Sequence, residues 1–511
     1  MKKSRGAAAG LAAAAAALGA EELVAGLLPG APSLIVSIGT LIIDLQPPGG
    51  KELFVALFGE ADKLALIVAV AAVALLIGAA LGAIATRNKT LADVGFLGFG
   101  ALALFAALRD PQATATLALL TTAIAVGVAV LVLRWLLSRA DRAAADGPAT
   151  EGSTTDPERR AFLRRAGATL VLGALAGTLG RYLIGVRDLP VVATTVMIPA
   201  AAETVAPPGA AATLQVPGLT PLVVPNDEFY RIDVNLVVPT IDADSWRLRI
   251  HGMVEREVEL TYQDLLAMPL VERYVTIACV SNEVGGDLVG NARWTGVRLR
   301  DVLAMAGVQP GATQLVGRAF DGWTAGFPTE IALDDGREAL IAVQMNGEPL
   351  PRAHGFPARL IVPGLFGYVS ATKWLSEIEL TTLESFDAYW VPLGWSKLGP
   401  ILTQSRIDVP ARGATVAAGL VTVAGVAWAP TRGVEAVEIR VDEGPWQACE
   451  LSQPLSDDTW IQWKRDWQAT AGRHTIQVRA TDGLGDVQTA DRTRPAPDGA
   501  RGHHTIDVQV G

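Results

Sequence analysis

Long apolar runs in the first third of the chain constrain its fold more than any other feature. They cover residues 6–28, 64–86, 94–108, 114–137 and 166–186. A helix needs about 20 apolar residues to cross a bilayer, and each run is near that length, with 94–108 short enough to be a tilted or partly interfacial helix. The sequence therefore predicts a membrane domain of about four helices over 1–139. Over 140–192 it predicts a linker, polar at 140–158, and a fifth helix.

Positive charges flank these runs in clusters. The clusters are Lys2, Lys3 and Arg5; Arg87 and Lys89; Arg134, Arg139 and Arg142; and Arg159, Arg160, Arg164 and Arg165. With about five spans all of them fall on one side, which the positive-inside rule makes cytoplasmic. We expect a multi-pass protein of the cytoplasmic membrane, with everything after residue 187 on the extracytoplasmic side.

The segment "ERRAFLRRAGA" (158–168) has two interpretations. It resembles a twin-arginine export signal, in which two arginines precede Phe-Leu, a basic residue and an apolar stretch. It lacks the Ser or Thr often found before the pair, and ordinary positive-inside anchoring explains the same residues. Twin-arginine export moves folded proteins, usually because a cofactor is inserted in the cytoplasm first.

Composition excludes several classes of protein. The net charge of −10 argues against a nucleic-acid-binding face, which needs clustered Lys and Arg. Two cysteines, Cys279 and Cys449, make neither a disulfide scaffold nor a four-ligand zinc site, although one bridge between them stays open. The apolar first third has no histidine, so its spans cannot hold a bis-histidine haem, and we expect no haem in this chain.

The apolar runs also contain two acidic residues. Glu21 and Glu22 lie in the first run, where a carboxylate facing lipid is costly. We therefore expect them near one membrane surface or facing other helices.

The remainder of the chain shows two patterns of predicted secondary structure. Strand-like and short helical segments mix without regular alternation, which predicts an α+β domain over 193–398. Examples are a strand over 245–254 and helices over 261–269 and 298–308. Short strands with turn signals then follow, as is typical of an immunoglobulin-like β-sandwich, here over 399–511.

Cys279 lies in "ERYVTIACVSNEVGGD" (272–287), where an apolar strand-like run enters a turn-rich segment. The thiol could be a buried space-filler, a nucleophile, half of a disulfide or a metal ligand. These residues by themselves leave the four alternatives open.

Three ordered motifs carry a resemblance to a known family. They are "VPNDEFYRID" (224–233), "IACVSNEVGGDLVGNARWTGVRLRDVL" (277–303) and "AVQMNGEPLPRAHGFPARLIVPGLFGYVSATKWLSEIEL" (342–380). Over about 220–510 the chain resembles the sulfite oxidase family of molybdopterin-dependent oxidoreductases, in a membrane-anchored bacterial form. The resemblance implies a sulfite-oxidase-like molybdopterin domain followed by a dimerisation-type domain, and hence a homodimer.

The resemblance also assigns residues to a molybdenum–molybdopterin cofactor. It makes Cys279 the metal ligand, and a thiolate suits a sulfur-rich molybdenum centre. Arg359 and Lys373 suit a phosphate, although each alone could be an ordinary charge on a strand face. The full implied set is Asn226, Phe229, Tyr230, Cys279, His354, Arg359, Thr372 and Lys373.

The residues that would meet substrate are less defined. Arg231 and Arg293 are the catalytic arginine candidates, and either could be structural. Glu283-Val284 stands where the sulfite-oxidising members have paired arginines, and a carboxylate facing the metal would repel a sulfite dianion. Tyr389, Trp390 and Trp395 are further candidates for the lining.

The sequence as a whole predicts a membrane-anchored molybdopterin oxidoreductase. It would transfer an oxygen atom to or from a small sulfur oxyanion or sulfoxide outside the membrane, and exchange electrons with a separate cytochrome- or quinone-linked partner. Two alternatives are the same scaffold acting on a non-sulfur oxide, and a non-catalytic binding module.

Overall fold

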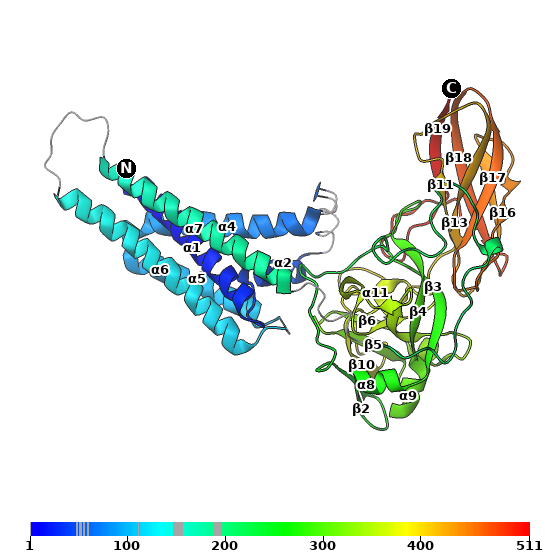
Figure 1. The fold of residues 1–511 in the computed structure, drawn as a ribbon, viewed down its shortest axis with the longest axis horizontal. Coiled ribbons are helices and arrows are strands. Elements are labelled where there is room, and N and C mark those ends of the chain that lie inside the picture. Colours follow the sequence, from blue (N-terminus) through cyan, green and yellow to red (C-terminus); the bar gives the residue numbers. More distant parts are fainter. Residues whose placement is uncertain are drawn as a thin grey trace. The chain divides into compact units, whose positions relative to one another are not determined.

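The computed structural model describes residues 2–47, 50, 54, 57–58, 61–110, 112–146, 157–187 and 197–511. The chain divides into two compact units (Figure 1). The first comprises Met1–Leu189 with Val234–Val238, and the second comprises Pro190–Asp233 with Pro239–Gly511.

The first unit is helical. Its described helices are α1 (Lys2–Leu27), α2 (Leu34–Asp44), α4 (Asp62–Ala85), α5 (Lys89–Ala107), α6 (Ala115–Asp146) and α7 (Pro157–Arg187). Among the described residues, five helices are long and apolar enough to cross a membrane, namely α1, α4, α5, α6 and α7. They coincide with the five predicted runs. The shorter apolar helix α2 was not predicted.

Several helices extend beyond their apolar runs, and α7 begins at Pro157, nine residues before the run at 166–186. Helix α5 begins at Lys89, five residues before the apolar run at 94–108, because Asn88 caps it by accepting a hydrogen bond from the Leu91 amide at 3.0 Å. Helix α6 continues to Asp146, so residues 140–146 of the expected polar linker are helical. The part of that linker over 147–156 lies outside the described residues.

Glycines let the backbone of α1 approach its neighbours. A Cβ added at Gly10 would lie 2.0 Å from the carbonyl oxygen of Gly78 on α4, and one at Gly19 would lie 2.1 Å from that of Gly173 on α7. Helices that pack in lipid use small residues in this way, since close van der Waals contact replaces the hydrophobic effect as the main attraction.

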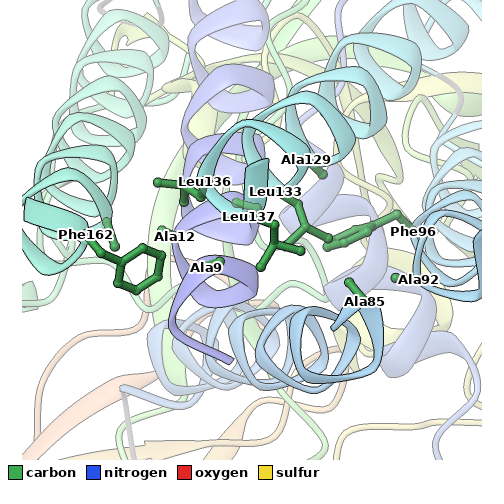
Figure 2. Packing of buried hydrophobic residues seen from close by; sticks show 12 residues of the cluster. Ala9, Ala12, Ala85, Ala92, Phe96, Ala129, Leu133, Leu136, Leu137 and Phe162 are labelled. Atoms are coloured by element: carbon green, nitrogen blue, oxygen red, sulfur yellow. The ribbon is translucent and has the colours of Figure 1, made fainter. Parts of the chain in front are cut away.

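The centre of the first unit is one apolar cluster. Figure 2 shows Leu133, Leu136 and Leu137 of α6 lying between Phe96 of α5 and Phe162 of α7, with alanines filling the remaining space. Because Ala9 and Ala12 of α1 and Ala85 of α4 belong to the same cluster, all five long helices meet in it.

The acidic pair of α1 faces other helices, as expected. Glu21 and Glu22 are 1% and 3% exposed. Glu22 Oε1 accepts from Ser33 at 2.6 Å and pairs with Arg181 of α7 at 2.9 Å, and Glu21 Oε2 accepts from the Leu34 amide at the start of α2 at 2.9 Å. These partners offset part of the cost of burying two carboxylates.

The second unit begins with one mixed and one antiparallel β-sheet. One has the strand order β2-β1-β10-β5-β6, and the other runs β3-β4-β7-β8 with β9 also paired to β7. The strands are β1 (Arg247–Gly252), β2 (Val258–Thr261), β3 (Leu270–Ala278), β4 (Val289–Arg298), β5 (Gln314–Ala319), β6 (Thr324–Pro328), β7 (Leu340–Met345), β8 (Glu348–Pro349), β9 (Arg359–Ile361) and β10 (Leu375–Thr381).

Short helices connect these strands. They are α8 (Tyr262–Ala267), α9 (Leu299–Ala306), α10 (Thr329–Leu333) and α11 (Gly367–Ser370), with 3₁₀ turns at η2 (Ala210–Ala212) and η3 (Arg352–His354). Helix α8 starts at a capping box, in which Thr261 and Asp264 each bond to the other's backbone amide. The strand expected over 245–254 and the helices expected over 261–269 and 298–308 are confirmed as β1, α8 and α9.

Two further sheets form the C-terminal β-region (residues 404–510), shown in orange and red in Figure 1. Their orders are β11-β13-β17-β16 and β12-β19-β18-β14-β15. Both sheets contribute to one buried cluster that includes Trp463 and Ile476. The strands are β11 (Gln404–Val409), β12 (Thr415–Val416), β13 (Gly419–Trp428), β14 (Val434–Val441), β15 (Gln447–Ala448), β16 (Glu450–Leu451), β17 (Ile461–Ala469), β18 (Gly472–Asp482) and β19 (His504–Val510).

Candidate functional site

Cys279 follows directly on β3 and begins a closed loop, the 279–288 loop. The thiol is 8% exposed. The Cys279 amide donates to the Leu288 carbonyl at 2.9 Å, and the Asn282 amide donates to the Cys279 carbonyl at 3.0 Å. Asn282 Oδ1 accepts from the Leu288 amide at 2.9 Å, which closes the loop a second time. The buried strand and this loop therefore hold the sulfur in a fixed place.

Both cysteines are free thiols. A bridge between Cys279 and Cys449 is therefore not formed, and the role of the Cys279 thiol depends on what else lies nearby.

Arg359 on β9 is a buried cation without a carboxylate partner among the described residues. Its side chain is 4% exposed, and its guanidinium donates to the carbonyls of His354 at 3.0 Å and Ala371 at 3.5 Å. It lies 5.1 Å from the ring centre of Trp294, while its buried Nε has no acceptor in the described structure. Burial lowers its pKa to about 10. A buried charge of this kind is stabilised by a bound anion.

Lys373 brings a second cation to the same place. Its Nζ donates to Asp233 Oδ2 at 3.0 Å, and the same oxygen accepts from Arg231 Nε at 2.8 Å. Burial lowers the pKa of Lys373 to about 8, although Asp233 opposes the change. Arg231 and Lys373 thus share the carboxylate of Asp233, whereas Arg359 has no carboxylate partner among the described residues.

The first motif packs against these cations. His354 Nε2 lies 3.0 Å from the Asn226 carbonyl, and Phe229 contacts both His354 and Trp294 edge to face at 5.7 and 5.9 Å. Desolvation raises the pKa of Tyr230; the charge of Cys279 acts in the same direction and that of Arg359 opposes it. Tyr230 is therefore close to both the thiol and the buried guanidinium, and it links the two halves of the expected site.

Thr372 is fully buried between strands. Its Oγ1 donates to the Gly317 carbonyl at 3.4 Å, and its own carbonyl accepts from the Leu360 amide at 2.9 Å. Thr372 thus fixes the segment between Arg359 and Lys373.

Asn346 joins the three motifs, and the sequence analysis did not single it out. Its Nδ2 donates to the Val224 carbonyl and to Asn226 Oδ1, both at 2.9 Å, while its Oδ1 accepts from the Arg293 amide at 2.9 Å. Its backbone has φ 53°, a left-handed conformation that Asn tolerates better than most residues. An Asn-Gly pair between two strand-like runs was the available signal.

Arg293 does not join this group. Its neighbour Trp294 contacts Phe229 and Arg359, and successive side chains of a strand point to opposite faces. Arg293 Nη1 instead lies 3.5 Å from Glu272 Oε1 on β3. The structure thus gives Arg293 a partner on the other face of the sheet. Glu283 is exposed on the 279–288 loop.

The aromatic candidates form a connected set, which we call the aromatic group: Tyr368, Tyr389, Trp390 and Trp395. Trp395 contacts both Tyr368 and Trp390, with ring centres 6.0 and 6.4 Å apart. Trp390 in turn contacts Tyr389, with ring centres 5.1 Å apart. Tyr368 was not predicted; it lies on α11, and a Cβ added at the preceding Gly367 would lie 3.7 Å from the carbonyl of Ala278. The backbone next to Tyr368 therefore lies near the residue that precedes Cys279.

The C-terminal β-region supports β3 from outside its own sheet. The Thr276 amide donates to the Asp458 carbonyl at 2.9 Å, and Thr276 Oγ1 accepts from the Trp460 amide at 2.8 Å. Trp460 Nε1 donates to the Leu222 carbonyl at 2.7 Å, just before the first motif. One tryptophan thus bridges the strand that carries the thiol and the segment that carries Asn226.

Comparison with known proteins identifies this region. The family model for the oxidoreductase molybdopterin binding domain matches residues 235–390. Mitochondrial sulfite oxidase of Homo sapiens is 31% identical over 315 residues, which cover 52% of this chain and 57% of the relative. The chain thus spans a little over half of that relative's length.

Two further comparisons cover other shares of the chain. The uncharacterized oxidoreductase YuiH of Bacillus subtilis is 36% identical over 158 residues, 31% of this chain and 76% of the relative. The crystal structure of the sulfane dehydrogenase SoxCD from Paracoccus pantotrophus aligns with 24% identity and a TM-score of 0.48, over 56% of this chain and 81% of that chain.

Buried His354 predicts a loss of stability in acid. Burial, with help from Arg359, lowers its pKa to about 4, against about 6.5 in an unfolded chain. The unfolded state then binds the extra proton first, so stability falls as pH decreases from about 6.5 to 4, by roughly 3 kcal/mol at most. Thermal unfolding across this range should show a shallower slope for His354→Gln.

His474 provides a control of opposite sign. Its hydrogen bond to Asp442 raises its pKa, so the stability it contributes is present in acid and is lost as pH rises. This titration lies above about pH 6.5, so His474→Gln should leave the decline between pH 6.5 and 4 unchanged. An unchanged slope in His354→Gln would contradict the assignment of His354.

Proposed function

The chain belongs to the sulfite oxidase-like family of molybdopterin oxidoreductases, and from this premise we propose that it transfers an oxygen atom to or from a small sulfur oxyanion or sulfoxide. The observation that carries the proposal is the buried cation cluster beside the Cys279 thiol. The cations suit the phosphate of a metal cofactor, and the thiol suits its metal.

The residues present fit a molybdenum–molybdopterin cofactor. When bound, this cofactor supplies two-electron oxygen-atom transfer. Arg359, whose buried Nε lacks an acceptor in the described structure, and Lys373 would hold the phosphate. Asn226, His354 and Thr372 shape the surrounding wall.

Cys279 would be the protein's metal ligand in this arrangement. The 279–288 loop fixes the sulfur through hydrogen bonds at the backbone of Cys279, so the thiol needs no further partner of its own. Tyr230 lies near both this thiol and Arg359. Its hydroxyl, whose pKa is raised by burial, would therefore lie beside the proposed reaction centre.

The arginine contacts favour an uncharged substrate over a dianion. Arg231 is paired with Asp233 and Arg293 with Glu272, so neither catalytic candidate is without a carboxylate. The ring faces of the aromatic group suit an apolar, polarisable molecule, and Gly367, next to Tyr368, lies near the Ala278 carbonyl. Of the two proposed substrate classes, these contacts support the sulfoxide.

The remaining parts of the proposal concern location and partners. The five long helices would anchor the chain in the cytoplasmic membrane, with the second unit outside and electrons exchanged with a cytochrome- or quinone-linked partner. We further propose that the C-terminal β-region is an immunoglobulin-like sandwich that forms a homodimer.

Arg359→Met tests the cofactor site. Loss of the charged hydrogen-bond donor should reduce cofactor retention by about tenfold or more, measured as pterin fluorescence and molybdenum per chain in the purified protein. Arg318→Met is the matched control, because Arg318 pairs with Glu379 in another sheet. Equal retention in both variants would contradict a phosphate role for Arg359.

Cys279→Ser tests the reaction. Turnover of a sulfoxide such as dimethyl sulfoxide, and of sulfite in the oxidative direction, should fall by more than about 100-fold, since even residues that only support a metal ligand contribute roughly 10–100-fold. Pterin content should stay near that of the parent, and Cys449→Ser should keep full activity. Full turnover by Cys279→Ser would refute the ligand role.

Replacing Arg159 and Arg160 by lysine tests the export signal. The change keeps both positive charges, so anchoring by charge is preserved while the arginine pair is lost. Protease added to spheroplasts should then fail to reach the second unit. Arg164→Lys with Arg165→Lys is the control, and unchanged access in the first variant would leave anchoring as the only role.

A further inference from the structure

Arg406 on β11 donates hydrogen bonds to three separate segments. Its side chain is 9% exposed. Nε donates to Asp408 Oδ1 at 2.6 Å, Nη1 to the Gly286 carbonyl at 2.8 Å and Nη2 to Thr220 Oγ1 at 2.9 Å. One guanidinium of the C-terminal β-region thus contacts both the 279–288 loop and the segment that precedes the first motif.

The bond from Arg406 reaches the 279–288 loop at Gly286, where the loop makes few other hydrogen bonds. Gly286 also donates to the Glu283 carbonyl at 2.8 Å, which is a contact within the loop. Next to it, Gly285 has φ +81°, and a Cβ there would lie 2.2 Å from the ring of His504. His504 Nδ1 accepts from the Ile407 amide at 2.9 Å, so the ring is held by the residue after Arg406. The His504 ring therefore packs against the loop at Gly285, and the charged Arg406 side chain donates to the Gly286 carbonyl.

We propose that Arg406 is a positioning residue that keeps the 279–288 loop closed and so holds the Cys279 sulfur where a metal can bind it. The inference rests on the ligand role proposed for Cys279. A charge-assisted hydrogen bond is stronger than a neutral one, and the loop's remaining bonds are made among its own residues. Without Arg406 the loop would open more often.

A purely structural role for Arg406 makes a different prediction. Asp408 Oδ2 accepts from the Thr220 amide at 3.2 Å, so the contact between β11 and the 220 segment persists without the arginine. Removing Arg406 should therefore loosen the loop more than it weakens the attachment of the β-region.

The test measures how often the loop opens in cofactor-free protein. In a Cys449→Ala background, Cys279 is the one remaining thiol, and its rate of reaction with a maleimide reports exposure of this 8%-exposed side chain. Arg406→Met should react about tenfold faster than the parent. Arg406→Lys, which keeps the charge and a single donor group, should give an intermediate rate.

Arg432→Met is the matched control. Arg432 also belongs to the β-region and also makes three bonds, to Asp482 at 2.8 Å and to the Ile401 carbonyl and Thr403 Oγ1 at 3.1 Å, with none to the loop. Its loss should lower the melting temperature by an amount similar to that of Arg406→Met and leave the labelling rate unchanged. Equal labelling rates in the two variants, or no acceleration in Arg406→Met, would overturn the proposal.

Loaded protein separates this inference from the proposed function. Arg406→Met should lower kcat with little change in KM, because it disturbs the ligand rather than the substrate contacts. If Cys279→Ser retains full turnover, the ligand role fails although the labelling result stands. If Cys279→Ser is inactive but labelling is unaffected by Arg406, the positioning role alone fails.

Discussion

The constraint on which the candidate site depends is a buried guanidinium that has no carboxylate partner in the described part of the chain. Arg359 lies between two carbonyls and the face of Trp294, and Lys373 nearby shares a single carboxylate with Arg231. Such an arrangement is costly by itself, so the fold must surround it with rigid supports. Thr372, Asn346 and the edge-to-face contacts of Phe229 provide them.

Much of the fold followed from local patterns. Runs of about 20 apolar residues identified five long helices, an alternating pattern identified β1, and short helical segments identified α8 and α9. The boundaries that differed were set by polar residues. Asn88 starts α5 before its apolar run, and α6 continues into the polar segment to Asp146. Hydropathy alone does not register a cap or a polar helix end.

The site was predicted less evenly. The motifs singled out Cys279, His354, Arg359 and Lys373, whose cofactor roles stay predictions, but which residues meet depends on side-chain direction. Arg293 illustrates this, because one position along β4 separates it from Trp294 and turns it to the opposite face. Asn346, Trp460 and Arg406 were missed because each joins a segment that lies more than 100 residues away in the chain.

The bridge formed by Trp460 has a consequence for the order of assembly. The strand that carries Cys279 and the segment that carries Asn226 are joined through a residue made about 180 positions after the cysteine. On a ribosome these two segments would therefore not be joined through this residue until Trp460 had emerged. Cofactor loading would then be a late event, and a nascent chain or one truncated before Trp460 would have an incomplete cofactor site.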